Sequence, residues 1–407
     1  MIAPVEATAP AQVRRLNLSV HVLNAGFVVT GVATTLLGPL LPGLSSRWSL
    51  SDAQAGLFFT AQFLGSICGV ALSSALLPSW GYRFTIAAGF VASGAGIAAL
   101  GLGSWTAGLL SAAIFGMGLG LTISGTNLFV AEASVARPAA ALSLLNLAWG
   151  IGAVACPPLA RLALRANRLE TFLIFVALFC ALAAGAVASL LPSQAGLPGR
   201  PAQELSASEA RQWSYPFLVS LGALFFLYVG TENSLAGWAA SFAKRLGTTA
   251  ELSWAITPSY FWGALVAGRA AAPVILRHLS EKIYVLGGLA VTLVSAAAML
   301  GASTSLQLTL SLGAVGLGLA AIFPILVTWL WEGLGVSSRR LGGLMFTLAG
   351  LGGAAMPWLV GLESTRSGSL QTGLIIPLVA LVVMMMLVRP ATRGLAAHAA
   401  HAAHAEV

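Results

Sequence analysis

Apolar runs long enough to cross a lipid bilayer recur along almost the whole sequence. A helix needs about 20 residues to cross the hydrocarbon core, at about 1.5 Å per residue. Inside that core a segment must satisfy its own backbone hydrogen-bonding groups, as a helix does. We therefore predict an all-α polytopic membrane protein with twelve transmembrane helices, at residues 17–42, 52–78, 83–103, 105–132, 138–163, 169–191, 215–242, 251–276, 283–302, 306–331, 340–361 and 370–388.

The composition excludes other classes. Only 8% of the residues are charged, whereas about a quarter are charged in an ordinary soluble domain. The net charge of +8 comes from Lys and Arg residues scattered singly between apolar runs. Because no basic stripe could follow a phosphate backbone, we expect the lipid bilayer, and no nucleic acid, as a partner.

One polar interruption divides the chain into two sets of six helices. It contains several Pro, Gly and Ser residues, which are typical of a linker. We expect a cytoplasmic N-terminal tail at 1–16, a six-helix bundle at 17–191, a cytoplasmic linker at 192–213, a second six-helix bundle at 214–389 and a disordered, His/Ala-rich cytoplasmic tail at 390–407.

The distribution of Lys and Arg predicts the orientation. If the N-terminus is cytoplasmic, most of the basic residues lie in the cytoplasmic loops. The positive-inside rule then places both termini and the linker in the cytoplasm. The sequence carries no cleavable signal pattern, and its Ala/Gly/Leu-rich composition suggests a bacterial inner (cytoplasmic) membrane.

The two halves also repeat short glycine motifs. Gly150-x-Gly152, followed by a proline at 157, returns as Gly350-x-Gly352 with a proline at 357, an offset of 200. Gly118-Leu-Gly-Leu returns at 316–319, an offset of 198. Parallel repeats of this kind are typical of transporters that rock about a site near the membrane midplane.

Twelve helices in two halves with a cytoplasmic linker resemble the major facilitator superfamily. More narrowly, three segments are similar to the fucose permease-like branch, which includes sugar:proton symporters and related glucose transporters. They are residues 118–130 around Asn127, residues 142–152 with Asn146-x-x-Trp149, and residues 228–238 with Tyr228-Val-Gly-Thr-Glu232. The resemblance implies two pseudo-symmetric six-helix bundles, a monomer, and a transporter instead of an enzyme.

The sequence departs from the fucose permeases at two positions. Those proteins place an Asp where Gly38 stands and a Glu where Ile123 stands, and these acids carry their proton coupling. Of the usual superfamily motif between helices 2 and 3, only residues 80–83 (Trp-Gly-Tyr-Arg) remain. The departures count against proton coupling by the fucose permease route.

Glu232 is the only acidic residue deep inside a predicted span. A carboxylate near the bilayer centre costs about 2.5–3.5 kcal/mol on insertion scales, so such residues usually serve pairing or function. We expect Glu232 first to bind substrate or gate access, and second to be the candidate for proton coupling. The alternative is a hydrogen-bonded carboxyl that only ties two helices together.

A sugar-binding site needs amides and carboxylates for the hydroxyls and aromatic rings for the sugar faces. For any single amide, a structural bond between helices is as good an interpretation as ligand contact. The candidate substrate-binding residues are Gln62, Asn127, Asn146, Trp149, Tyr228, Glu232, Asn233, Trp238, Tyr260 and Trp262.

Charged residues at the predicted cytoplasmic ends form a second candidate group. We expect a latch that closes the inner ends of the helices and stabilises the outward-facing state. Simple solvated charges that obey the positive-inside rule are the alternative. The candidate cytoplasmic gate consists of Arg83, Glu132, Arg137, Arg269, Arg277, Glu332, Arg339 and Arg340.

Two function classes remain. The first is a secondary active or facilitative transporter that moves a monosaccharide, or a similar small polar metabolite, by alternating access. The second is a drug or lipophilic-cation exporter of the same fold, in which Glu232 would attract the cation. We expect no metal site and no cofactor, and we leave open whether a proton or a sodium ion is a co-substrate. Substrate identity and transport direction stay open.

Overall fold

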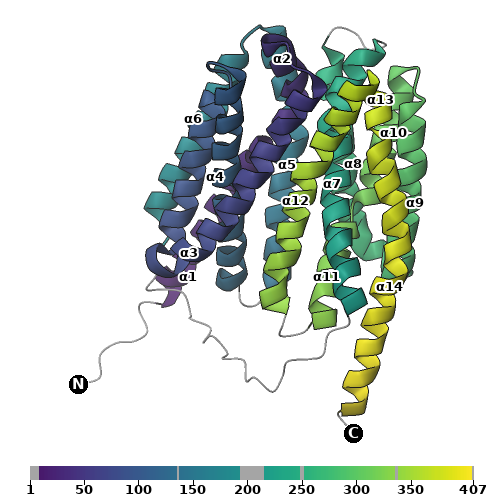
Figure 1. Cartoon of the computed structure of the whole chain (residues 1–407). Coiled ribbons are helices and arrows are strands. Elements are labelled where there is room, and N and C mark those ends of the chain that lie inside the picture. Colours follow the sequence, from purple (N-terminus) through teal and green to yellow (C-terminus); the bar gives the residue numbers. More distant parts are fainter. Residues whose placement is uncertain (1–8, 135–136, 193–214, 248–251, 335–337, 406–407) are drawn as a thin grey trace. The chain divides into compact units, whose positions relative to one another are not determined.

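The computed structural model describes residues 9–134, 137–192, 215–247, 252–334 and 338–405 (Figure 1). Within these ranges the regular elements are helices and no strand occurs, which confirms the predicted all-α class. The predicted linker from residue 193 onward and the first half of the expected N-terminal tail, residues 1–8, lie outside the described residues.

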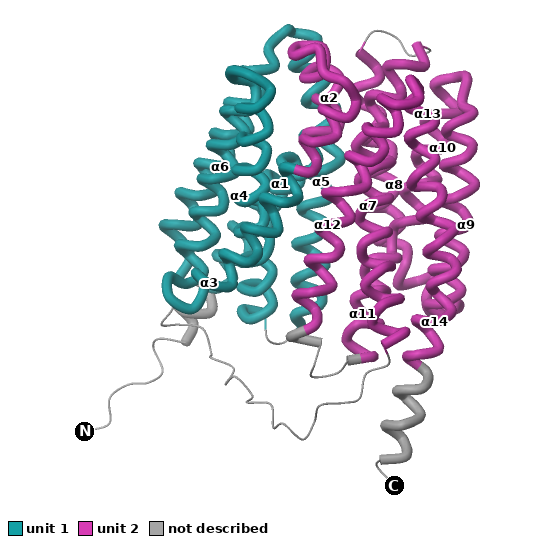
Figure 2. Tube along the Cα trace, viewed as in Figure 1, with its two compact units in different colours: residues 1–36, 61–201 teal, residues 37–60, 202–407 magenta. Residues whose placement is uncertain are grey.

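Two compact units make up the chain (Figure 2). Unit 1 contains residues 1–36 and 61–201, and unit 2 contains residues 37–60 and 202–407. The division does not fall at the linker alone, because the segment 37–60, from the first two spans, groups with the second half of the chain.

Unit 1 is a helical bundle whose core is formed by large apolar side chains. Leu23, Phe27, Phe90 and Phe129 are among its buried residues. Its elements are α1 (Ala9–Thr35), most of α3 (Asp52–Ala99), α4 (Trp105–Ala133), α5 (Pro138–Arg165) and α6 (Leu169–Leu190).

Unit 2 is built around α7, which packs against α12 and α14 (Figure 1). It also contains the first turns of α3. Its elements are α2 (Leu37–Trp48), α7 (Tyr215–Leu246), the 3-10 helix η3 (Ser253–Ile256), α8 (Thr257–Ile275), α9 (Glu281–Leu300), α10 (Ser305–Leu319), α11 (Ile322–Leu334), α12 (Ser338–Ser367), α13 (Leu370–Gly373) and α14 (Ile375–Ala405).

The helices account for the predicted spans. Ten helices of the described chain are long and apolar enough to cross a membrane. One of them, α3, contains two spans joined at Gly81, whose φ of 75° is in the region that glycine adopts readily. The remaining span is α8, which is 19 residues long and carries Arg269 in its interior. Counting α3 twice and adding α8 gives the twelve helices of the prediction.

Two spans are broken next to a proline. The first span changes from α1 to α2 at Leu36, three residues before Pro39. The tenth changes from α10 to α11 at Ala320 and Ala321, before Pro324. Proline has no N–H and clashes with the carbonyl four residues earlier, so the helix is interrupted and carbonyl groups become free for other donors.

The repeated glycines mark equivalent close helix contacts in the two units. In unit 1, a side chain at Gly152 would overlap the main-chain oxygen of Val28 on α1. In unit 2, a side chain at Gly352 would overlap the main-chain oxygen of Phe226 on α7. The repeat found in the sequence therefore has a physical basis, because both positions need glycine for the approach of two backbones.

The structure differs from the expectation for the C-terminal tail. We expected disorder from residue 390, whereas α14 continues as helix to Ala405. The reason is local, since this segment is rich in alanine, the residue with the highest helix propensity.

Candidate functional site

Glu232 lies near the middle of α7 and faces a positive charge. Its Oε1 is 3.7 Å from Nη2 of Arg269 on α8 and 3.1 Å from the hydroxyl of Tyr228, one turn earlier on α7. The side chains of Glu232 and Arg269 are 12% and 27% exposed, so the pair is mostly shielded from solvent. Arg269, which we assigned to the cytoplasmic gate, lies within α8 and pairs with Glu232 in this structure.

The break between α10 and α11 completes this cluster. The hydroxyl of Tyr228 is 3.0 Å from the main-chain oxygen of Leu319. Arg269 donates a hydrogen bond through Nε to the main-chain oxygen of Ala320 at 3.0 Å. Pro324 cannot supply the N–H that would normally bond to Ala320, four residues earlier. Glu232, Tyr228 and Arg269 thus join α7 and α8 to the broken helix.

Three aromatic candidates are buried in unit 2. Trp238 is fully buried, and its indole nitrogen donates to the main-chain oxygen of Pro357 at 2.9 Å. Tyr228 is also fully buried, and Trp262 is 6% exposed and packs edge-on against Phe261. Both Trp238 and Tyr228 use their polar atoms within unit 2, which favours a packing role over the predicted contact with a ligand. Tyr260, on the same helix as Trp262, is 41% exposed.

In unit 1, Gln62 and Trp149 meet at Thr34 of α1. Gln62 donates through Nε2 to the main-chain oxygen of Thr34 at 3.1 Å, and Trp149 donates through Nε1 to its hydroxyl at 3.4 Å. Gln62 is buried, whereas Trp149 is half-buried. The structure thus ties α1, α3 and α5 together through two of the predicted site residues.

Three candidate asparagines share one bonding pattern. Asn127, Asn146 and Asn233 each donate through Nδ2 to the main-chain oxygen four residues earlier in the same helix, at 2.8, 2.9 and 2.9 Å. None of these bonds reaches another helix. Each local bond uses the amide donor and leaves the amide oxygen as an acceptor, and none of the three side chains is fully buried.

The predicted cytoplasmic gate is only partly described. Arg83, Glu132 and Arg137 are exposed residues of unit 1, and the Tyr82 hydroxyl interacts with Glu132. In unit 2, Arg277 and Glu332 are exposed. The side chains of Arg339 and Arg340 lie outside the described part, and the latch stays a prediction.

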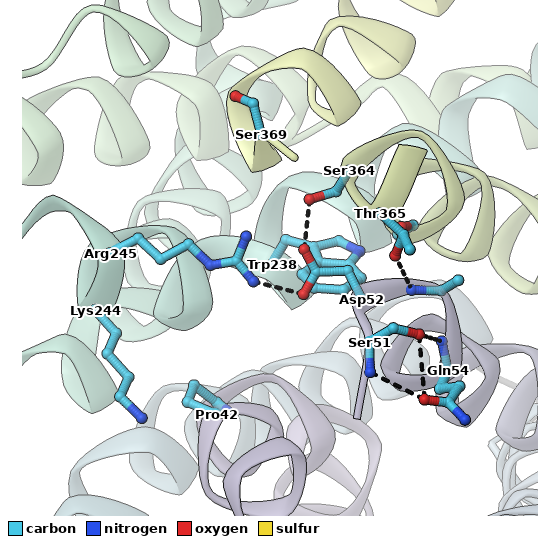
Figure 3. Close-up of polar contacts among 12 residues, drawn as sticks. Pro42, Ser51, Asp52, Gln54, Trp238, Lys244, Arg245, Ser364, Thr365 and Ser369 are labelled. Atoms are coloured by element: carbon cyan, nitrogen blue, oxygen red, sulfur yellow. Dashed lines mark hydrogen bonds and ion pairs between the residues drawn. The ribbon is translucent and has the colours of Figure 1, made fainter. Parts of the chain in front are cut away.

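A polar cluster that we did not predict lies where α3 begins, within unit 2 (Figure 3). Asp52, in the first turn of α3, forms an ion pair of 2.5 Å with Arg245 in the last turn of α7 and accepts a hydrogen bond from Ser364 of α12. Nearby, the Ala53 N–H donates to Thr365 at 2.9 Å, and Lys244 bonds to Ser46 of α2 at 3.3 Å.

The start of α3 at this cluster has a local cause. Ser51 and Gln54 form a capping box: the Ser51 N–H donates to Gln54 Oε1 at 3.0 Å, and the Gln54 N–H donates to Ser51 Oγ at 3.3 Å. This pattern fixes Asp52 in the first turn, where the helix dipole favours a carboxylate. The capping pattern is the sequence signal that could have drawn attention to Asp52.

Comparison with known proteins decides the family. Residues 23–357, most of the chain, match the Major Facilitator Superfamily. This chain belongs to the Major Facilitator Superfamily. It is an integral membrane transporter and not an enzyme.

Similar proteins include several sugar transporters. The chain is 22% identical over 383 residues to Sodium-dependent glucose transporter 1A of Mus musculus, covering 84% of this chain and 88% of that one. It is 23% identical over 349 residues to the Glucose/mannose transporter GlcP of Bacillus subtilis (strain 168), covering 83% and 86%. A solved D-xylose-proton symporter shares the fold, with a TM-score of 0.74 and 17% identity over 90% of this chain and 96% of that one.

Described residues contain no group of three or more His, Cys, Asp or Glu side chains placed to hold a metal ion. The predicted site residues present amide oxygens, the exposed ring of Tyr260, and the carboxylate of Glu232, which faces the guanidinium of Arg269. These groups are suited to non-covalent binding of a polar solute.

Proposed function

We propose that this chain transports a monosaccharide, or a similarly small polar metabolite, across a bacterial inner membrane by alternating access. The observation that carries the substrate class is the alignment, over more than four fifths of each chain, with a glucose transporter and a glucose/mannose transporter. The fold by itself does not distinguish sugars from other solutes.

The free amide oxygens support a sugar as the substrate. Asn146 and Asn233 form their local bonds through Nδ2, so the amide oxygen of each stays available as an acceptor within the part of the chain that the structure describes. Sugar hydroxyls are donors, and a bound sugar would satisfy these oxygens without breaking the local bonds. Tyr260 offers an exposed ring on which a sugar face could stack.

The exporter alternative is weakened by the position of Arg269. It depends on a carboxylate that attracts a lipophilic cation, but Glu232 already faces the guanidinium of Arg269. A second cation at the same carboxylate would be repelled by Arg269, and no other observation favours this function.

The cluster at Asp52 supports a mechanism in which one end of the helix bundle opens and closes. It holds the segment 37–60 of the first two spans against α7 and α12. In the predicted topology this end is extracellular. We propose that Asp52, Arg245 and Ser364 hold that end closed and separate when substrate enters from outside.

The proposal can be tested with purified protein in detergent. Melting temperatures are measured with D-glucose, D-mannose, D-xylose and L-fucose, and separately with lipophilic cations, because a ligand that binds the folded state stabilises it by mass action. Uptake of the stabilising sugar into proteoliposomes then tests transport. Stabilisation by lipophilic cations alone would contradict the sugar assignment.

Two variants test the amide oxygens. Asn146→Ala and Asn233→Ala each remove one acceptor, and we expect about two- to tenfold weaker sugar binding from the loss of about 0.5–1.5 kcal/mol. Ser143→Ala is the matched control, because Ser143 makes the same kind of local bond on the same helix as Asn146. Unchanged sugar affinity in both asparagine variants would exclude these oxygens from the site.

A further inference from the structure

Negative charge converges where α10 ends. The main-chain oxygens of Leu319 and Ala320 lie at the C-terminus of α10, where the helix dipole is negative. Tyr228 lies beside the first oxygen and the Glu232 carboxylate, and Arg269 beside the second oxygen and the same carboxylate. Arg269 is the cation that opposes this group.

Tyr228 cannot satisfy this group by itself. Its hydroxyl carries one hydrogen but lies within 3.1 Å of Glu232 Oε1 and within 3.0 Å of the Leu319 oxygen. One acceptor is therefore left without that hydrogen at any moment. A positive charge beside the carboxylate compensates for the missing hydrogen bond. The guanidinium of Arg269 is in that position.

The same oxygen atoms match the ligands of a small cation. A carboxylate and main-chain carbonyls are hard oxygen ligands. Carbonyl groups at the break of a membrane helix coordinate coupling cations in other transporter folds. Unit 1 lacks such a set on its corresponding helix, since α4 runs without interruption from Trp105 to Ala133.

We propose that Arg269 is a built-in cation that fills a site for a small monovalent cation, Na+ or Li+, formed by Glu232 and the main-chain oxygens of Leu319 and Ala320. While Arg269 is present, this site binds no Na+. Removing its charge opens the site to Na+. This inference does not depend on which solute is carried, so it stands or fails separately from the proposed function.

The test compares melting temperatures in NaCl and in choline chloride at equal ionic strength. The natural protein is expected to melt at the same temperature in both salts. Arg269→Gln is expected to be less stable in choline chloride and to gain about 2 °C or more from Na+, because the ion binds the folded state. Direct binding of radioactive Na+ to the purified variant, and not to the natural protein, provides a second readout.

Three further variants separate this site from a general loss of charge. Arg269→Lys retains a cation and should not respond to Na+. Glu232→Gln combined with Arg269→Gln removes the carboxylate ligand and should not respond either. Arg366→Gln removes an exposed arginine in the last turn of α12 and should behave like the natural protein.

Several outcomes would overturn the proposal. One is selective stabilisation of the natural protein by Na+ over choline. Another is a folded Arg269→Gln variant that neither binds Na+ nor gains stability from it. If Arg269→Gln does not fold in either salt, this also counts against the proposal, because Na+ should replace the missing charge and restore folding in NaCl.

Discussion

Asp52 and Arg245 form an ion pair between the first turn of α3 and the last turn of α7, although 193 positions separate them in the sequence. Arg245 is 46% exposed and Asp52 14% exposed, so solvent screens the pair and its contribution to stability is small, about 0–1 kcal/mol. A contribution of that size is still enough to change the ratio of two conformations several-fold.

The first prediction therefore concerns how readily a reagent in solution reaches residues near Asp52. We expect little change in the stability of the protein. Asp52→Asn should raise the rate at which an impermeant maleimide labels a cysteine at position 55, where the natural Ala55 is fully buried. We expect up to about a fivefold increase, equivalent to about 1 kcal/mol. The measurement uses a background in which the exposed Cys68 is replaced by Ser.

A charge exchange provides the control for this prediction. Asp52→Arg combined with Arg245→Asp restores opposite charges and should bring the labelling rate back toward that of the background. If Asp52→Asn leaves labelling unchanged, the ion pair does not hold this end closed.

The second prediction separates packing from substrate binding at Trp238. Trp238→Phe removes the indole N–H and leaves the main-chain oxygen of Pro357 without its donor. We expect a loss of about 1–3 kcal/mol in stability, read as a lower melting temperature, with unchanged sugar affinity. A variant with normal stability and weakened sugar binding would instead return Trp238 to the binding site.

The third prediction compares glycines whose surroundings leave no room for a Cβ atom with glycines whose surroundings do. Gly152→Ala and Gly352→Ala should each destabilise by about 1–3 kcal/mol, because the added Cβ overlaps a main-chain oxygen. Gly185 and Gly263 have no atom within 4 Å of the added Cβ. Alanine there should be neutral or stabilising by up to about 1 kcal/mol, since glycine is unfavourable within helices.

Fluorescence-detected size-exclusion chromatography after heating measures all four glycine variants in one series. Equal melting temperatures for the crowded and uncrowded pairs would show that the close helix contacts of Gly152 and Gly352 are not important for stability.

The fourth prediction concerns the broken helix. Pro324→Ala supplies an N–H that can bond to the Ala320 oxygen, in competition with Nε of Arg269. We expect a more continuous helix and a melting temperature at least as high as that of the natural protein. Transport should be slower, because a continuous helix bends less readily than one interrupted at a proline. Full transport activity in this variant would show that the break is not required.

Much of the fold follows from the sequence, because lipid offers no hydrogen-bond partners to the backbone and few structures can satisfy it internally. The spans could be placed because each helix satisfies its own hydrogen bonds. The offset of the repeat depends on helix packing, which the sequence motif alone does not show. The sequence paired Gly118 with Gly316, whereas Gly118 packs on Gly89 and Ser93, and Gly318 packs on Gly288 and Thr292. Equivalent contacts thus pair Gly118 with Gly318.

The candidate site was harder to predict because its partners lie on different helices. Glu232 stood out as a deep acid, but its pairing with Arg269 depends on the packing of α7 against α8 and on the break at Pro324. The burial of Trp238 depends on a main-chain oxygen of α12, for which the sequence gives no signal. Asp52 and Arg245 could have been paired from the predicted topology, which places both at the same membrane face.

The break at Leu36 bears on how the chain assembles during synthesis. Residues 37–60 belong to unit 2, although they are made long before α7 and α12. When the ribosome has completed the first six helices, this segment still lacks the contacts of its own unit. Fragments cut at the linker should therefore be poor independent folders, and co-expression of both fragments should rescue the first from degradation.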